Sequence, residues 1–347
     1  MSHASRSQQS GDYRGGRVSM STNVVNVGVV GVGSFGQHHA RIYTQHSEAT
    51  LVGVLDRSPE RTRDIAQRHG CEQFSDLDAL LTVVDAVSIA TPAAHHAKIA
   101  TQCLERGVHV LVEKPIAISV DEAKRCVALA ADQKCIYQIG HLERFNSAMV
   151  AVQDLITVPH FIDSHRWSGF SGHSADVDVV LDLMIHDLDI LLWLVGSEVE
   201  DVRASGVRVQ SSSLDIATAR IVFRNGCVAN VSASRVSDEK VRTMTIAQPE
   251  NVLILNHASG TVRVYPSLAQ SELNEEQQVH EVTGHDDEPL WRELDSFLRC
   301  IQENTAPPVS GHDGLAALQL AHHVVAEIQS CFPSAMMSES LPTVRTG

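Results

Sequence analysis

From Asn23 to His141 the chain alternates between short apolar runs and segments whose apolar residues recur at helical spacing. The apolar runs, rich in valine and isoleucine, fall at 24–30, 50–56, 85–92, 108–112 and 135–141. Helical spacing follows the first four runs, after the glycine turn at 31–36 and at 59–69, 95–107 and 119–134. Ser119 and Glu122 have the spacing of a capping box at the start of the last helix. This alternation predicts right-handed crossovers and an α/β Rossmann domain with a doubly wound parallel sheet.

After His141 the pattern changes to apolar residues at every second position, which is typical of half-buried strands. Such segments fall at 161–170, 199–210, 214–226, 227–237 and 241–266. Asn225-Gly226 is a strong signal for a hairpin turn. Helical segments are expected at 176–195, 289–304 and 313–330. The pattern predicts an α+β domain with a large open, mostly antiparallel sheet.

The domain boundaries follow from these patterns and from two polar ends. We expect a disordered tail, a Rossmann domain, a domain for substrate binding and oligomerisation, and a C-terminal tail. Their ranges are 1–22, 23–142, 143–330 and 331–347. The N-terminal segment lacks the apolar core of a signal peptide, and the coding start is left open between Met1 and Met20.

Composition narrows the class of partner. The 347 residues carry a formal net charge of −15, which argues against nucleic acid or an anionic membrane as partner. No apolar run approaches a membrane span. The seven cysteines are scattered without a C-x-x-C pair, a pattern that suits reduced thiols in the cytoplasm. An anionic ligand would have to be met locally, by helix N-termini or by individual arginines and lysines.

The glycine turn between the first strand and helix has the dinucleotide-binding pattern G-x-G-x-x-G. Its glycines are Gly31, Gly33 and Gly36, with Ser34 and Phe35 between the last two. The second strand ends in Asp56 about 20 residues further on, the spacing at which a carboxylate meets the adenosine ribose. Asp56 favours NAD as the cofactor, whereas the adjacent Arg57 can also pair with the 2′-phosphate of NADP.

Polar residues follow three other strands of the predicted parallel sheet. They are Thr91-Pro92, Glu113-Lys114 and Gly140-His141. Because the carboxyl ends of parallel strands meet at one edge, these residues are expected beside the glycine turn, at the mouth of a cofactor cleft.

The ordered motifs resemble those of the Gfo/Idh/MocA oxidoreductase family. The matching elements are the glycine turn with His39, Asp56-Arg57, the segment 91–100 with His96, E-K-P at 113–115, and D-x-x-x-H at 182–186. The resemblance spans roughly 23–330 and implies an NAD-dependent sugar dehydrogenase. It implies that Thr91, Pro92, His96, Glu113 and Lys114 lie along the cofactor, and that the open sheet face forms a dimer interface. A homodimer or homotetramer is therefore expected.

By the same resemblance Lys114, Asp182 and His186 are the catalytic residues. The i, i+4 spacing of Asp182 and His186 places both on one helix face. His186 is suited to accept the hydroxyl proton, Lys114 to stabilise the alkoxide, and Asp182 to orient the pair. Lys114 as the base is the alternative. The alternative without a catalytic role is that Lys114 is a solvent-exposed lysine and that Asp182 and His186 form a pair on a helix surface. No metal site is expected.

Substrate identity depends on the segment "GHLERFN" at 140–146. It resembles the subgroup that contains UDP-N-acetylglucosamine 3-dehydrogenases. The resemblance implies oxidation of the 3-hydroxyl to a 3-keto sugar, which an aminotransferase partner would convert to a 3-amino sugar for lipid A. Arg144 and Arg166 are then candidates for the diphosphate, and Glu143, Asn146 and His186 for the sugar. The alternatives are a dehydrogenase of a free cyclic polyol such as inositol, and a non-catalytic NAD-sensing subunit.

Overall fold

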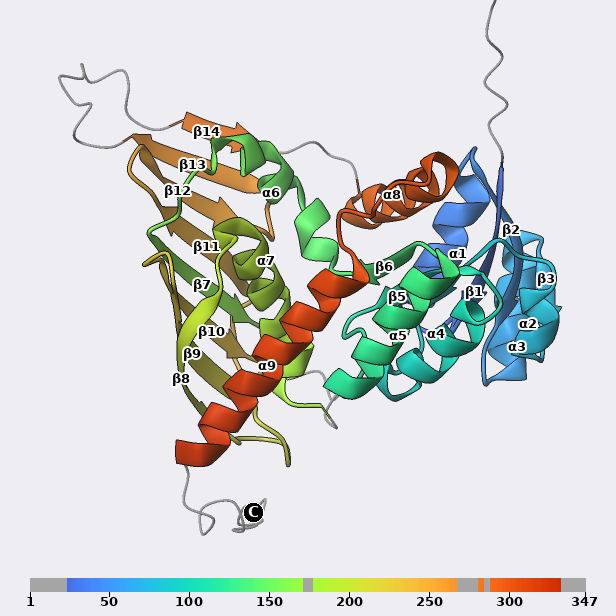
Figure 1. The fold of residues 1–347 in the computed structure, drawn as a ribbon, viewed down its shortest axis with the longest axis horizontal. Coiled ribbons are helices and arrows are strands. Elements are labelled where there is room, and N and C mark those ends of the chain that lie inside the picture. Colours follow the sequence, from blue (N-terminus) through green and yellow to red (C-terminus); the bar gives the residue numbers. More distant parts are fainter. Residues whose placement is uncertain (1–23, 171–176, 267–279, 284–287, 332–347) are drawn as a thin grey trace, which may run out of the picture.

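The computed structural model describes residues 24–170, 177–266, 280–283 and 288–331 of the chain. Both predicted tails fall outside these ranges, except for Cys331, which ends the last helix. The described residues form two sheets, one on each side of the molecule, with helices between and around them (Figure 1).

The first sheet is parallel throughout, as the sequence predicts. Its strands are β1 (Val25–Val30), β2 (Ala49–Leu55), β3 (Glu72–Phe74), β4 (Ala86–Ile89), β5 (His109–Glu113) and β6 (Tyr137–Gly140). Their order is β3-β2-β1-β4-β5-β6. The chain therefore adds strands on one side of β1 as far as β3, and then on the other side from β4 to β6. A crevice for a ligand opens at this kind of switch point, outside the carboxyl ends of the strands. The short strand β3 was not predicted.

Helices on both faces cover this sheet. They are α1 (Gly36–Gln45), α2 (Pro59–His69), α3 (Leu77–Leu81), α4 (His96–Leu104) and α5 (Val120–Gln133). The predicted capping box is confirmed, because the Ser119 side chain accepts from the Glu122 amide and the Glu122 side chain accepts from the Ser119 amide. Gly70 ends α2 with φ at 67°, a backbone conformation that favours glycine.

The second sheet has eight strands in the order β14-β13-β12-β11-β7-β10-β9-β8. They are β7 (Phe161–Trp167), β8 (Val199–Val207), β9 (Ile216–Phe223), β10 (Val228–Ser234), β11 (Val241–Ala247), β12 (Asn251–Asn256), β13 (Thr261–Pro266) and β14 (His280–Thr283). Among the described strands of this sheet only β7 and β10 pair in parallel, so the sheet is mostly antiparallel, as expected. The strand β14 was not predicted.

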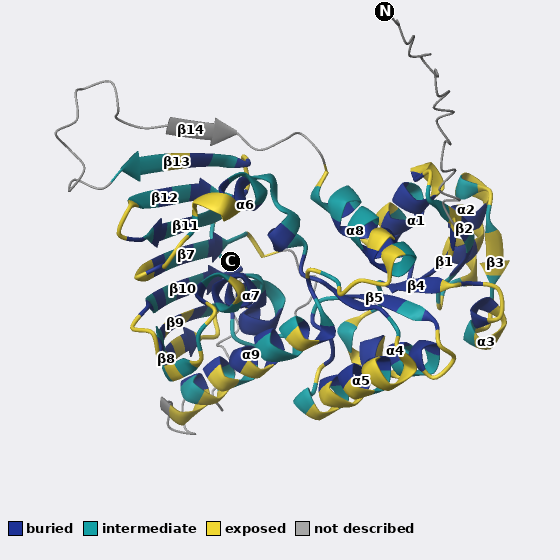
Figure 2. Cartoon of the chain, turned by 45° about the horizontal axis from the view of Figure 1, so that its top comes forward, coloured by how far each residue is buried: buried dark blue, intermediate teal, exposed yellow. Residues whose placement is uncertain are grey.

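One face of this sheet is covered by helices and the other is open (Figures 1 and 2). The covering helices are α6 (Ser147–Val152), the π-helical turn η4 (Val180–Met184), α7 (Ile185–Val195) and α9 (Gly311–Cys331). Burial alternates along β9, where Ala217, Ala219 and Ile221 are buried between more exposed residues. This alternation is the physical basis of the period-two sequence pattern.

The position of helix α8 (Pro289–Glu303) requires a correction to the predicted domain boundary. Its apolar residues Leu294, Phe297 and Leu298 belong to the core formed by β1 and α1 of the Rossmann domain. The helix therefore completes the first domain, although it follows the second domain in sequence (Figure 1). Apolar periodicity showed that the helix is amphipathic but could not show which sheet its apolar face would cover.

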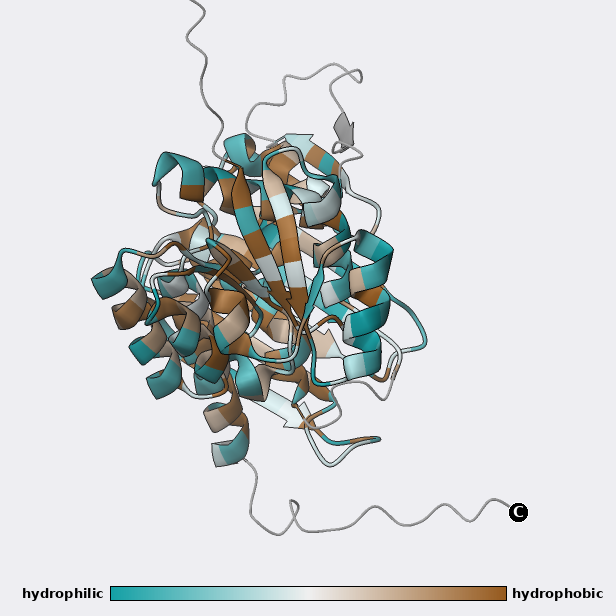
Figure 3. Ribbon diagram, turned by 90° about the vertical axis from the view of Figure 1, so that its right-hand side faces the viewer, coloured by the Kyte–Doolittle hydropathy of each residue, from teal (hydrophilic) through white to brown (hydrophobic). Residues whose placement is uncertain are grey.

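The remaining core runs continuously from the other face of the Rossmann sheet into the second domain. Helix α9 contributes Leu318, Ala321 and Val324 to this core and lies along both domains. Figure 3, viewed from the Rossmann side, shows hydrophobic strands surrounded by helices with mixed hydropathy. Within the described ranges, no helix has the length and apolar character to cross a membrane.

Candidate active site

The glycine turn is tightly packed at its first and third glycines and open at its second. Gly31 has φ at 86°, and a Cβ on Gly36 would lie 1.8 Å from the carbonyl oxygen of Gly31. A Cβ on Gly33 would meet nothing nearer than Nη1 of Arg61, at 4.0 Å. Among the described side chains none caps the N-terminus of α1, although the amides of Gln37 and His38 donate to the carbonyl oxygens of Gly33 and Phe35. The turn therefore allows the close backbone approach and offers the positive helix end that a pyrophosphate requires.

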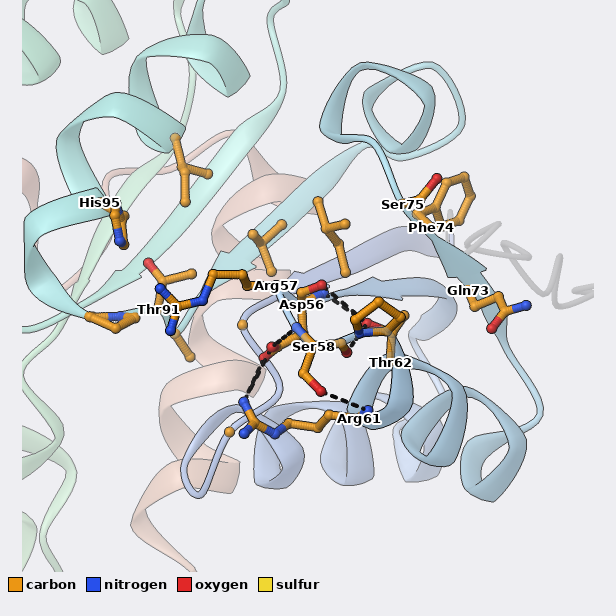
Figure 4. A pocket seen from close by; sticks show the side chains of 18 of the residues that line it. Asp56, Arg57, Ser58, Arg61, Thr62, Gln73, Phe74, Ser75, Thr91 and His95 are labelled. Carbon is orange, nitrogen blue, oxygen red and sulfur yellow. Dashed lines mark hydrogen bonds and ion pairs between the residues drawn. The ribbon is translucent and has the colours of Figure 1, made fainter.

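A cleft of about 1010 Å³ opens beside this turn at the sheet's switch point (Figure 4). Eight of the predicted cofactor residues line it. They are Gly31, Gly33, Ser34, Phe35, Asp56, Arg57, Thr91 and Pro92. The cleft is of the right type and in the right place for the adenosine half of a dinucleotide.

Asp56 is held in place by several donors at the floor of this cleft. Its carboxylate accepts hydrogen bonds from the amides of Val32 and Ser58, at 2.9 Å each. Nη1 of Arg61 lies 3.2 Å from both carboxylate oxygens. Arg57 also lines the cleft (Figure 4), so this part of the cleft combines the predicted acceptor with two cations.

Several lining residues were not identified from the sequence. They are Ser58, Arg61, Arg63, Gln73, Phe74, Ser75 and His95. Gln73 to Ser75 lie at the end of β3, whose three residues carry too little apolar pattern to identify it as a strand. In the structure Ser58 caps the first turn of α2 and accepts from the amide of Arg61, a position that Ser58-Pro59 in the sequence could have indicated.

Two residues expected along the cofactor, His96 and Glu113, have partners within the protein itself. The ring nitrogens of His96 lie 2.8 Å from the carbonyl oxygens of Pro115 and Thr91, and the side chain is buried. It ties the loop after β5 to the loop after β4. Oε1 of Glu113 lies 3.1 Å from Nε2 of buried His39.

Lys114 and Asp182 come together as predicted, although they are 68 residues apart. Lys114 follows β5 and precedes a cis peptide bond to Pro115. Its Nζ donates to the main-chain oxygen of Asp182 and lies 3.3 Å from the carboxylate. Asp182 belongs to η4, which α7 continues without interruption. The contact joins the Rossmann edge to the helical segment of the second domain.

His186 lies in the first turn of α7, one helical turn beyond Asp182. Burial, followed by the charges of Lys114 and Arg166, lowers its pKa well below the ordinary 6.5. Its Nδ1 is buried and has no hydrogen-bond partner among the described residues. Burial and these two cations disfavour the charged form of the ring, so the uncharged imidazole can serve as a proton acceptor.

His141 is a further residue of this site that sequence reasoning placed at the edge without assigning a role. It is 1% exposed, and its ring lies edge-on to the ring of His186, with the centroids 6.4 Å apart. Burial lowers its pKa, and neither ring nitrogen has a partner among the described residues. The sequence could have indicated this role, because His141 directly follows β6 and so lies beside Lys114 at the end of β5.

Arg144 and Arg166, which were predicted to contact a diphosphate, form internal ion pairs in the structure. The guanidinium of Arg166 is 3% exposed and binds both oxygens of Asp187, at 2.7 and 3.0 Å. The guanidinium of Arg144 binds Asp189 in the same way, at 2.7 and 2.6 Å. Both carboxylates belong to α7, so the two arginines fasten the helix that carries His186. A buried guanidinium is stabilised only when it is paired, and these partners are supplied by the protein itself.

Glu143 and Asn146 also make contacts that hold the second domain together. Glu143 accepts from Arg166 at 2.8 Å and lies 3.1 Å from Nδ1 of His257. Burial alone would raise the pKa of Glu143, but these two partners outweigh it and hold the pKa well below its usual value. Asn146 caps α6 and donates to the main-chain oxygen of His257.

The described residues include no group of three or more His, Cys, Asp or Glu side chains arranged to hold a metal ion. The site thus combines the cleft beside the glycine turn with a lysine, a carboxylate and two imidazoles, of which Lys114 and His141 follow the neighbouring strands β5 and β6. Such a set can move a proton and stabilise a developing negative charge on oxygen.

Comparison with family models identifies both halves of the chain. Residues 25–141 match a model described as an oxidoreductase family with an NAD-binding Rossmann fold. Residues 155–249 match a model described as the GFO/IDH/MocA C-terminal domain. NAD is accordingly the cofactor of the cleft.

Individual relatives match over most of their length. A UDP-N-acetylglucosamine 3-dehydrogenase of Acidithiobacillus ferrooxidans is 38% identical over 315 residues, which cover 88% of this chain and 98% of the relative. A solved structure of that enzyme has a TM-score of 0.83 at 33% identity, covering 90% of this chain and 99% of the other. A scyllo-inositol 2-dehydrogenase (NAD(+)) of Bacillus subtilis is 26% identical over 321 residues, covering 85% and 92%.

Proposed function

Because the chain belongs to the Gfo/Idh/MocA family of NAD-dependent oxidoreductases, we propose that it oxidises the 3-hydroxyl of UDP-N-acetylglucosamine to a ketone. The observation that carries the proposal is the contact of Lys114 with Asp182, one helical turn before His186. Lys114 follows β5, which pairs with β4, and the residues after β4 line the dinucleotide cleft.

Bound NAD would accept the hydride from C3 of the sugar. Uncharged His186 accepts the hydroxyl proton, because burial and the charges of Lys114 and Arg166 disfavour the protonated ring. Lys114 stabilises the oxygen as negative charge develops on it. Asp182 holds the ammonium in place and offsets its charge.

The choice of substrate is supported by similarity. The relative with 38% identity carries the name UDP-N-acetylglucosamine 3-dehydrogenase, whereas the inositol-oxidising relative has 26% identity. The similarity to the first extends over nearly its whole length, including the second domain, where the sugar would bind.

Three further features belong to this proposal. The 3-keto product suits an aminotransferase, which would yield a 3-amino sugar for lipid A. The open face of the second sheet supports a homodimer or homotetramer. The reduced thiols of the described cysteines fit a cytoplasmic location.

The test is to incubate the purified full chain with NAD and a panel of UDP-sugars and inositols, and to follow the absorbance of reduced nicotinamide. An aminotransferase or a carbonyl trap removes the keto product, so that an unfavourable equilibrium does not hide turnover. We expect reduction of NAD with UDP-N-acetylglucosamine and little with myo- or scyllo-inositol. The reverse ranking would assign the chain to the polyol dehydrogenases, and the proposal would be wrong.

A further inference from the structure

A nucleotide-sugar dehydrogenase must bind a diphosphate close to its catalytic groups. The diphosphate is attached to C1, two ring carbons from C3, so it lies within one sugar ring of His186. The whole chain carries a net charge of −15, and a local cation is therefore needed. Arg144 and Arg166 are buried and internally paired, which leaves the diphosphate without its predicted partners.

Arg242 lies at the start of β11, directly opposite Arg166 on β7. Residues opposite one another in an antiparallel pair point to the same face of the sheet, so Arg242 points to the face that α6 and α7 cover. Met244 and Ile246, two and four residues further along β11, lie on this face and are buried. Arg242 therefore belongs to the side of the sheet that contains the active site.

Two arginines directly across a strand pair repel each other, which costs free energy. The carboxylates around them favour Arg166, which holds both oxygens of Asp187 and has a 2.8 Å contact with Glu143. Arg242 reaches the same oxygen of Glu143 only at 3.7 Å, and its side chain is 36% exposed. A long, partly exposed ion pair contributes little, so the guanidinium keeps donors for a ligand.

The position of Arg242 relative to the chemistry follows from its neighbours. Glu143 lies between Arg242 and Arg166, and the charges of Glu143 and Arg166 both act on His186. An anion bound by Arg242 would thus lie on the second-domain side of the catalytic imidazole. That is where the phosphate end of a sugar with its C3 at His186 would extend.

We propose that Arg242 binds the diphosphate of the nucleotide sugar and selects it over uncharged sugars and polyols. This inference rests on the proposed function, because it assumes an anionic substrate. The guanidinium is a planar fork that binds two phosphate oxygens at once, which an ammonium cannot do in the same geometry. In this proposal Arg166 and Glu143 support Arg242 and make no contact with the phosphates.

The test compares the wild-type chain with R242A, R242K and R242Q, and with R125A as control, since Arg125 is an exposed arginine on α5. We expect R242A to raise KM for UDP-N-acetylglucosamine roughly ten- to hundred-fold, the loss of one charge-assisted interaction, with little change in kcat. R242K should retain part of the affinity. In calorimetry, the dissociation constant of UDP should rise with KM, whereas the binding of NADH should be unchanged.

R242Q keeps a polar head without the charge, and it takes the place of R242A if R242A does not fold. A KM and a UDP dissociation constant within twofold of those of wild type and R125A, in either neutral variant, would overturn the role of Arg242. A wild-type chain that neither binds UDP nor oxidises UDP-sugars would instead overturn the proposed function. The wild-type measurement thus separates the two failures.

Discussion

At the scale of single residues, the protonation state of His186 decides what the site can do. Its ring is partly covered, and the cations Lys114 and Arg166 act on it, so the charged form is disfavoured. An imidazole that stays neutral in acid solution remains a proton acceptor there. The ammonium of Lys114, held by Asp182, is then free to stabilise negative charge on the substrate oxygen.

This arrangement predicts an unusual acid limb in the pH profile. The base is active when it is deprotonated, and its pKa is lowered well below 6.5. As the pH falls through 6.5, kcat/KM should therefore remain nearly constant, and it should decline only in more acidic solution. The measurement is kcat/KM against pH with UDP-N-acetylglucosamine and NAD. The H186N variant should react much more slowly, and its pH profile should lack the acid limb. An acid limb of the wild-type profile centred at pH 6.5 or above would contradict the assignment of His186 as the base.

At the scale of elements, the turn between β1 and α1 separates two roles of glycine. Gly36 allows the helix to approach the turn, since a Cβ there would lie 1.8 Å from a backbone oxygen. Gly33 faces open space, where the absence of a side chain matters only when a ligand is present. Packing and ligand approach thus depend on different residues of one motif.

We predict that G33A and G36A differ in stability although both bind NADH poorly. G33A should keep the wild-type melting temperature, because its methyl group meets no atom nearer than 4.0 Å. G36A should lose about 1–3 kcal/mol of unfolding free energy, because the added methyl group forces the backbone apart. Thermal unfolding without cofactor and NADH titration measure the two effects. An equal loss of stability in both variants would argue against this division.

At the scale of the whole molecule, the two domains are connected by more than the single crossing of the chain at His141. Helix α8 follows the second domain in sequence but packs on the Rossmann sheet, and α9 lies along both domains. The core on one face of the Rossmann sheet runs on into the second domain. We therefore expect the two domains to unfold together.

Phe297 on α8 provides the test, since it is fully buried against the Rossmann core. F297A should lower the free energy of unfolding by about 3–5 kcal/mol and weaken NADH binding, although residue 297 lies far beyond the Rossmann segment in sequence. Urea unfolding followed by tryptophan fluorescence and by circular dichroism should give one coincident transition. F161A is the control, because Phe161 is 37% exposed and its loss should cost much less. Two separate transitions in the wild-type chain would contradict a shared core.

The sequence by itself determined the elements and the edge at which the site lies. Apolar periodicity located the strands and helices because side-chain direction is set by local backbone geometry. The G-x-G-x-x-G turn, Asp56 and Lys114 could be assigned because each follows directly from the end of a strand. In a parallel sheet those ends share one edge, so no knowledge of distant packing was needed.

Only the tertiary structure decided which charges are available to a ligand and which hold the protein together. Arg144 meets Asp189 across 45 residues, and Arg166 meets Asp187 across 21, because α7 packs against both the segment after β6 and strand β7. The sequence pattern of a buried arginine is the same whether its partner is a phosphate or a carboxylate of the chain. The sequence could not determine that α8 packs on the first sheet, for the same reason. An apolar helix face indicates that the face is covered, but it does not indicate which element covers it.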